Sequence, residues 1–239
     1  MELIRDLWTR AWAVHGPLSS ITVVVIGAVA FGLVLAAWPV VRSVITVCHE
    51  GGHALVAVLS GRQLAGIRLH SDTSGLTVTR GRPRGPGMVA TLLAGYPAAS
   101  LLGIGAAALA SVGYSAAVLW VGVGLLAVML LKVRNIYGFL VVLGLGAGVG
   151  LVSWYAQPLV LAWLGHAVAW LLLLGGPRPV LELLGHGRHP RAQVSDAHQL
   201  AQLTHVPRLV WITLWLALGL GALVVGGRWL LLGLPVPAS

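Results

Sequence analysis

About seven long apolar runs dominate this sequence, and most are long enough to cross a lipid bilayer as a helix. Inside a bilayer the backbone must satisfy its own hydrogen bonds, which favours helices for runs of this length. The runs cover residues 19–38, 41–60, 88–111, 115–131, 139–152, 159–174 and 207–225. We therefore predict an all-α polytopic membrane protein with about seven transmembrane helices.

The composition agrees with a membrane protein and argues against a nucleic-acid-binding protein. The chain is 58% hydrophobic and 9% charged, whereas a soluble protein carries about 25% charged residues. The net charge of +9 could indicate a nucleic-acid partner. However, the basic residues are mostly arginines between apolar runs, where they set the orientation of membrane helices. We expect a lipid bilayer as the environment and no nucleic-acid partner.

The distribution of basic residues predicts which loops are cytoplasmic. In an arrangement of seven spans, only Arg42 and Arg228 fall on one side. The opposite side carries Arg5, Arg10, the arginines of residues 61–87, Lys132, Arg134, Arg178, Arg188, Arg191 and Arg208. Because cytoplasmic loops are enriched in Lys and Arg, we expect the N-terminus, residues 61–87 and residues 175–206 to be cytoplasmic.

The chain divides into a short amphipathic start and one membrane domain. Residues 1–18 carry charges together with Trp8 and Trp12, a pattern typical of an interfacial helix. Residues 19–235 are expected to form a single membrane domain that includes a cytoplasmic loop at 175–206. In that loop, Ser195 is expected to cap a short helix, and the histidines are expected to form a solvated surface.

Residues 61–87 interrupt the helical pattern and predict a small β-hairpin. Ile67 and Leu69 alternate with polar residues, turn residues follow at 71–75, and Leu76 and Val78 alternate with threonines. This hairpin has two possible roles. It is either a surface connection between helices or a strand edge that holds an extended peptide by main-chain hydrogen bonds.

The motif His49-Glu50-Gly51-Gly52-His53 lies near the middle of the second apolar run. On a helix, His49 and His53 are one turn apart on the same face and can bind one metal ion together. Glu50 points about 100° away from His49, beside the metal but not on it. There it can act as the catalytic base that takes a proton from water.

These features resemble the site-2 protease family of intramembrane zinc metalloproteases, most closely its small bacterial members without a PDZ domain. The resemblance rests on His49 to Ala54, on the hairpin, and on Leu92-Leu93-Ala94-Gly95-Tyr96-Pro97-Ala98-Ala99. The last stretch is similar to an alanine-glycine-proline motif of the family, with a tyrosine inserted. The resemblance covers residues 41–138 and implies a zinc cofactor and a bacterial cell membrane.

The sequence departs from this family at the expected third metal ligand. The family usually has an aspartate in a leucine-aspartate-glycine motif, where this chain reads Arg134-Asn135-Ile136-Tyr137-Gly138. Neutral Asn is a poor zinc ligand. Asp196 is the first choice for the third ligand, because it opens a helix before the last span and could fold back to the site. Asn135 is the alternative, as a ligand or as an amide that holds substrate. Asp196 could also serve only as a helix cap.

The resemblance implies an intramembrane zinc metalloendopeptidase that hydrolyses a peptide bond of a transmembrane protein or peptide. The alternative is a non-catalytic membrane protein of the same fold that binds partner helices. A transporter with a His-lined path is a third possibility, disfavoured because no second acidic residue lies in a predicted span.

Overall fold

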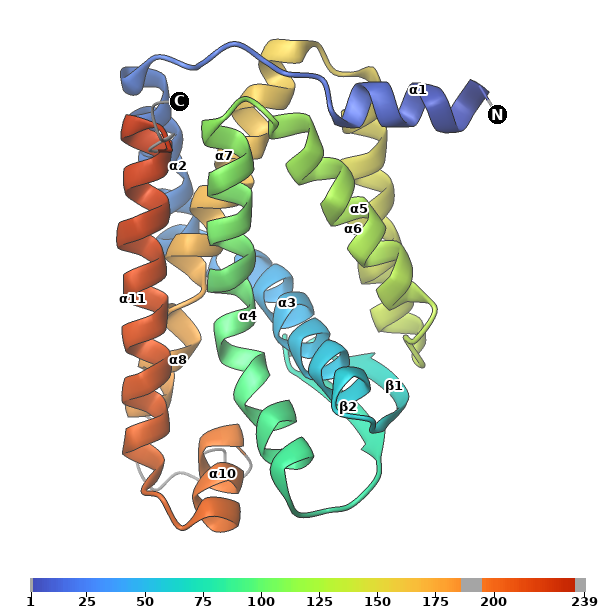
Figure 1. The fold of residues 1–239 in the computed structure, drawn as a ribbon, viewed down its shortest axis with the longest axis vertical. Coiled ribbons are helices and arrows are strands. Elements are labelled where there is room, and N and C mark those ends of the chain that lie inside the picture. Colours follow the sequence, from blue (N-terminus) through green and yellow to red (C-terminus); the bar gives the residue numbers. More distant parts are fainter. Residues whose placement is uncertain (1, 186–194, 235–239) are drawn as a thin grey trace, which may run out of the picture.

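The computed structural model describes residues 2–185 and 195–234, and every predicted apolar run forms a helix (Figure 1). The chain is an integral membrane protein built from long apolar helices. The helices of the described residues, both the long apolar ones and shorter ones, are α1 (Glu2–Ala11), α2 (Ser20–Ala36), α3 (Trp38–Leu59), α4 (Pro86–Ser111), α5 (Ser115–Leu130), α6 (Ile136–Tyr155), α7 (Pro158–Gly175), α8 (Arg178–Gly185), α10 (Asp196–Thr204) and α11 (Arg208–Leu232).

The number of membrane crossings differs from the number of helices. Within residues 2–185 and 195–234, four helices are long and apolar enough to cross a membrane, and α5 is a shorter apolar helix. Helices α2 and α3 meet at an angle of 99° and pass the same test only as a pair, which raises the number to five. Seven separate crossings are therefore not confirmed.

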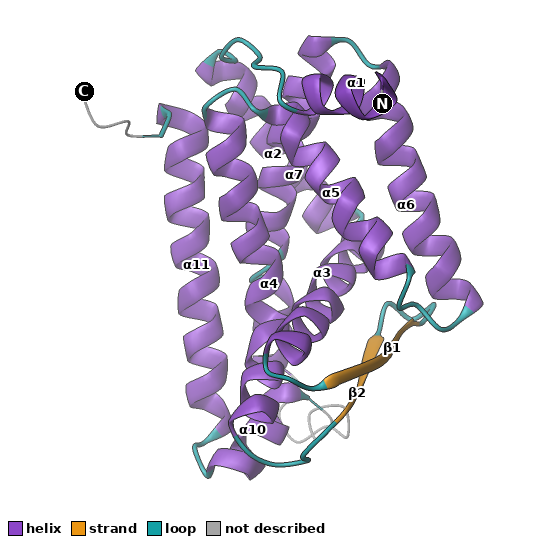
Figure 2. Cartoon of the chain, turned by 45° about the vertical axis from the view of Figure 1, so that its right-hand side comes forward, coloured by secondary structure: helices purple, strands orange, loops and turns teal. Residues whose placement is uncertain are grey.

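The bend between α2 and α3 puts α1 and the hairpin at opposite ends of the bundle (Figures 1 and 2). Arg10 of α1 donates to the carbonyl oxygen of Trp154 at the α6 end, with an N to O distance of 3.1 Å. The hairpin instead contacts the connection between α5 and α6, where Ile67 N donates to Lys132 O over 2.9 Å. With α2 and α3 counted as one span, α1 and the hairpin lie at opposite ends of the bundle, and the prediction that the N-terminus and the hairpin share one side is not confirmed.

The predicted β-hairpin is confirmed. Strands β1 (Gln63–Leu69) and β2 (Gly75–Arg80) pair antiparallel, with Gln63 opposite Arg80 and Leu69 opposite Gly75. The other edge of β1 is covered by the chain that follows α5, because Arg134 N donates to Ile67 O. Strand β2 is thus the second edge of the sheet, and it lies against α3.

Helix α10 holds part of the polar segment 175–206 against the bundle. Its N-cap Ser195 accepts a hydrogen bond from the His198 amide, as the sequence predicts. Its apolar residues Ala197 and Leu200 are fully buried with Leu92 and Trp215 of α4 and α11. Among the histidines expected on a solvated surface, His205 is exposed and His198 half-buried, and His186 and His189 lie outside the described residues.

Helices α3 and α4 approach each other closely at Gly52. A methyl group added there would lie 2.6 Å from Ala94 O and 2.7 Å from the Ala98 side chain. Close backbone approach through small residues is how helices pack in lipid. This contact fixes α3, and the motif it carries, against α4.

We expect Gly52→Ala to destabilise the protein by about 1–3 kcal/mol, because the added methyl group overpacks the α3–α4 contact. Gly51→Ala is the matched control, since an added methyl group there meets no atom within 4 Å. The measurement is the thermal unfolding midpoint of both variants in the same detergent. Equal midpoints for the two variants would contradict the close contact.

Candidate metal centre

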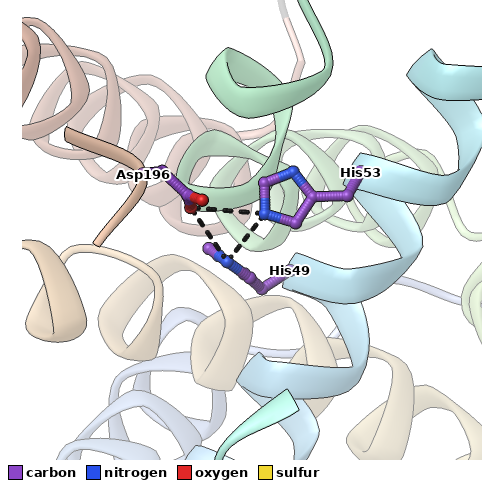
Figure 3. Close-up of side chains that lie close together, drawn as sticks. All are labelled: His49, His53 and Asp196. Atoms are coloured by element: carbon purple, nitrogen blue, oxygen red, sulfur yellow. Dashed lines mark hydrogen bonds and ion pairs between the residues drawn. The ribbon is translucent and has the colours of Figure 1, made fainter. Parts of the chain in front are cut away.

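Helix α3 places both histidines of the motif on one face. The Nε2 atoms of His49 and His53 lie 3.0 Å apart, and both rings point toward the start of α10 (Figure 3). His53 is buried and His49 half-buried. The two rings are therefore arranged to share one ligand, as their spacing predicts.

Asp196 joins the two histidines from the first turn of α10. Its Oδ2 atom lies 3.3 Å from His49 Nε2 and 3.2 Å from His53 Nε2 (Figure 3). One donor atom from each residue lies within 4.8 Å of the other two. Two imidazoles and a carboxylate form a donor set that suits zinc, so the residues present fit the metal.

The environment of Asp196 keeps its carboxylate ionised. Burial alone would raise its pKa, but hydrogen bonds and charge from His49 and His53 outweigh burial and hold the pKa below its ordinary value. A metal ligand must be in its deprotonated form. The carboxylate at this position is therefore in the state that binds a cation.

Asn135, the alternative third ligand, lies elsewhere and holds the hairpin. Its Nδ2 donates to Leu69 O over 2.6 Å, and its Oδ1 accepts from Leu69 N over 3.2 Å. This side-chain amide thus pairs with the edge of β1 as another strand would. The structure does not bring Asn135 to the histidine pair.

Helix α4 orients His53 and leaves room for both rings. The Nδ1 of His53 donates to Thr91 O over 2.7 Å, which leaves Nε2 available to a metal. A Cβ on Gly95 would lie 2.5 Å from the His53 ring and 2.6 Å from the His49 ring. The sequence does not indicate the role of Thr91, because a backbone carbonyl acceptor carries no residue-specific signal.

Glu50 is buried between α3 and the hairpin. Its Oε2 accepts from the Thr77 hydroxyl of β2 over 2.6 Å, and a Cβ on Gly75 would lie 2.5 Å from Oε1. A cavity of about 170 Å³ adjoins Glu50 and is also lined by His49 and Tyr96. The Glu50 carboxylate therefore lies beside the candidate ligands, next to a space that can admit water and part of a peptide.

Thr77 and Tyr96 belong to this site, although the sequence alone assigns neither of them a role there. Thr77 is one of two threonines that alternate in β2, and only the fold shows which of them reaches Glu50. The Tyr96 ring lies edge-on to His49, with 4.7 Å between ring centroids. Its insertion in the alanine-glycine-proline stretch is the one signal that pointed to it.

Comparisons with known proteins identify one family. The model of the family described as Peptidase M50B-like matches residues 21–226, which is most of the chain and includes all three candidate ligands. No curated protein and no solved structure matches this chain.

Proposed function

Because the chain belongs to the Peptidase M50B-like family, which is the site-2 protease family, we propose that it is an intramembrane zinc metalloendopeptidase. Members of this family are metallopeptidases embedded in membranes. We assign the zinc ligands as His49, His53 and Asp196, and the catalytic base as Glu50. The observation that carries this proposal is the convergence of two imidazoles and one carboxylate, with donor atoms within 4.8 Å of one another.

The chemistry divides between the metal and Glu50. A zinc ion held by His49, His53 and Asp196 would supply a Lewis acid that activates water and polarises a peptide carbonyl. Glu50 takes the proton of the attacking water and then donates it to the amine that leaves. The Thr77 hydroxyl orients the carboxylate through Oε2, which leaves Oε1 for this transfer.

The substrate we propose is a segment of a membrane protein in extended form. A helix hides its peptide bonds in its own hydrogen bonds, so a transmembrane substrate must unwind before it is cut. Strand β2 runs beside Glu50, and the far edge of β1 is already paired with the chain after α5. We therefore assign the β2 edge, rather than β1, to main-chain contacts with substrate.

We propose that the hairpin end of the bundle faces the cytoplasm of a bacterial cell. Arg68, Arg80, Arg82, Arg84 and Lys132 are exposed at this end, and cytoplasmic loops are enriched in Lys and Arg. Because α1 lies at the other end of the bundle, this assignment puts the N-terminus outside the cytoplasm, opposite to the expectation from seven spans.

Metal analysis of the purified protein tests the proposal and its third ligand. We expect about one zinc ion per chain in the wild type. Loss of a carboxylate that itself binds the metal should cost more than the roughly 10–100-fold in affinity that a residue supporting a ligand contributes, so Asp196→Ala should be nearly metal-free. Asn135→Ala should keep its zinc, since its amide pairs with Leu69.

The matched pair of variants gives each result a clear meaning. A metal-free Asn135→Ala protein with zinc retained in Asp196→Ala would overturn the ligand assignment. If the wild-type protein stays metal-free in excess zinc, this result would contradict the proposed peptidase function. It would favour a non-catalytic protein that binds partner helices. Cleavage of a membrane peptide that is lost with chelator and restored by zinc would complete the support.

A further inference from the structure

An arginine lies in the second turn of α3, on the same face of this helix as His49 and His53. Arg42 precedes His49 by two helical turns, so that both side chains point the same way. Both residues line the cavity that adjoins Glu50. An ionisable residue within a membrane helix is costly and usually marks a functional path.

The salt bridge of Arg42 leaves part of its side chain exposed. Its Nη1 lies 3.3 Å from Glu182 Oε2 in α8, and its side chain remains 41% exposed. The other oxygen of Glu182 accepts from the Trp38 indole over 2.7 Å, so that this carboxylate is shared. A guanidinium has five N–H donors in a planar fork that suits a carboxylate. Arg42 can therefore take a second carboxylate from the cavity side.

We propose that Arg42 forms a substrate subsite that binds a carboxylate near the scissile bond, and this inference rests on the proposed peptidase function. Two turns of helix separate Arg42 from His49 by about 10 Å. An extended chain advances about 3.3 Å per residue. If the extended substrate runs along α3, the bound carboxylate belongs to a residue about three positions from the bond that is cut.

Two sources can supply this carboxylate. One is an Asp or Glu side chain within the substrate, and the other is the C-terminal carboxylate of a chain that ends about three residues after the cut. Both offer the same two oxygen atoms to the guanidinium. Peptides that differ only in these groups separate the two sources.

The test is a cleavage profile of a mixed peptide library with zinc-loaded protein in detergent micelles, read by mass spectrometry. We expect Asp or Glu, or a free C-terminus, to be enriched two to four residues from the cut. One neutral peptide with an amidated C-terminus is then chosen from the profile. It is compared with a variant that carries Asp at the enriched position, and with a form that has a free C-terminal carboxylate. The ratio of kcat/KM between charged and neutral peptides should fall about 10–100-fold in Arg42→Gln, as expected for a charged hydrogen bond.

This ratio does not depend on how much of a variant folds, because both peptides meet the same protein. Arg42→Glu should reverse the preference toward a Lys-bearing peptide, and Glu182→Gln should strengthen the preference for Asp by removing the competing carboxylate. A wild-type ratio near one, or an unchanged ratio in Arg42→Gln, would overturn the inference while the peptidase stands.

A binding measurement decides the inference even if no peptide is cut, an outcome that would count against the peptidase alone. Fluorescence anisotropy gives the affinity of the same peptides for the Glu50→Gln protein and for the Arg42→Gln/Glu50→Gln protein. Tighter binding of the charged peptide only when Arg42 is present supports the subsite. Equal binding of charged and neutral peptides by both proteins refutes it.

Discussion

Glu50→Gln is expected to lower the rate of peptide cleavage by at least about 10²–10⁴-fold, the usual contribution of a general base, with the zinc content unchanged. The amide keeps the shape of the side chain and can still accept from the Thr77 hydroxyl. It cannot take a proton from water at neutral pH. Zinc should stay bound because Glu50 is not among the three candidate ligands. The measurements are kcat on a membrane peptide and zinc per chain on the same sample.

The matched control is Glu2→Gln, which removes a carboxylate from the exposed helix α1. We expect this variant to cleave at the wild-type rate. Unchanged cleavage by Glu50→Gln would rule out the proposed base. Loss of zinc together with cleavage would instead place Glu50 among the ligands.

The sequence predicts the helices well because lipid leaves the backbone few alternatives. A long apolar run must form its hydrogen bonds internally, and each predicted run is helical.

The path of the chain through the membrane is harder to predict from the sequence. The 99° bend after α2 involves contacts between distant residues, including a hydrogen bond from Arg178 to the Val34 carbonyl oxygen and the ring of Trp38 beneath the Arg178 guanidinium. No local pattern near Ala37 indicates those contacts.

The candidate site also contains residues that the local sequence predicts and residues that only the tertiary fold brings together. His49, Glu50 and His53 are predicted from one short motif in an apolar run, together with the periodicity of a helix. Asp196 was only one of two candidates, because its position depends on how Leu200 packs between α4 and α11. Asn135 stayed open for the same reason, since its pairing with Leu69 joins segments far apart in the sequence. Local geometry is thus readable from the sequence, whereas the approach of Asp196 to the two histidines requires the tertiary fold.

Gly95→Ala is expected to remove zinc and cleavage together, although Gly95 is no ligand. The added Cβ would lie 2.5–2.6 Å from both imidazoles, closer than real Cβ contacts allow. Neither ring can yield easily, because the His53 ring is fixed by Thr91 O and the His49 ring by the edge of Tyr96. The rings must therefore move apart, and the shared binding point is lost. Zinc per chain and the cleavage rate are measured on purified protein.

Gly105→Ala on the same helix separates this local effect from a general effect on α4. An added methyl group at Gly105 meets no atom within 4 Å, so we expect zinc and cleavage at wild-type levels. The unfolding midpoint in detergent should stay close to wild type in Gly105→Ala, and Gly95→Ala should remain folded while free of metal. If Gly95→Ala binds zinc as tightly as Gly105→Ala does, the two imidazoles do not meet the metal in the arrangement described, and the ligand assignment fails with it.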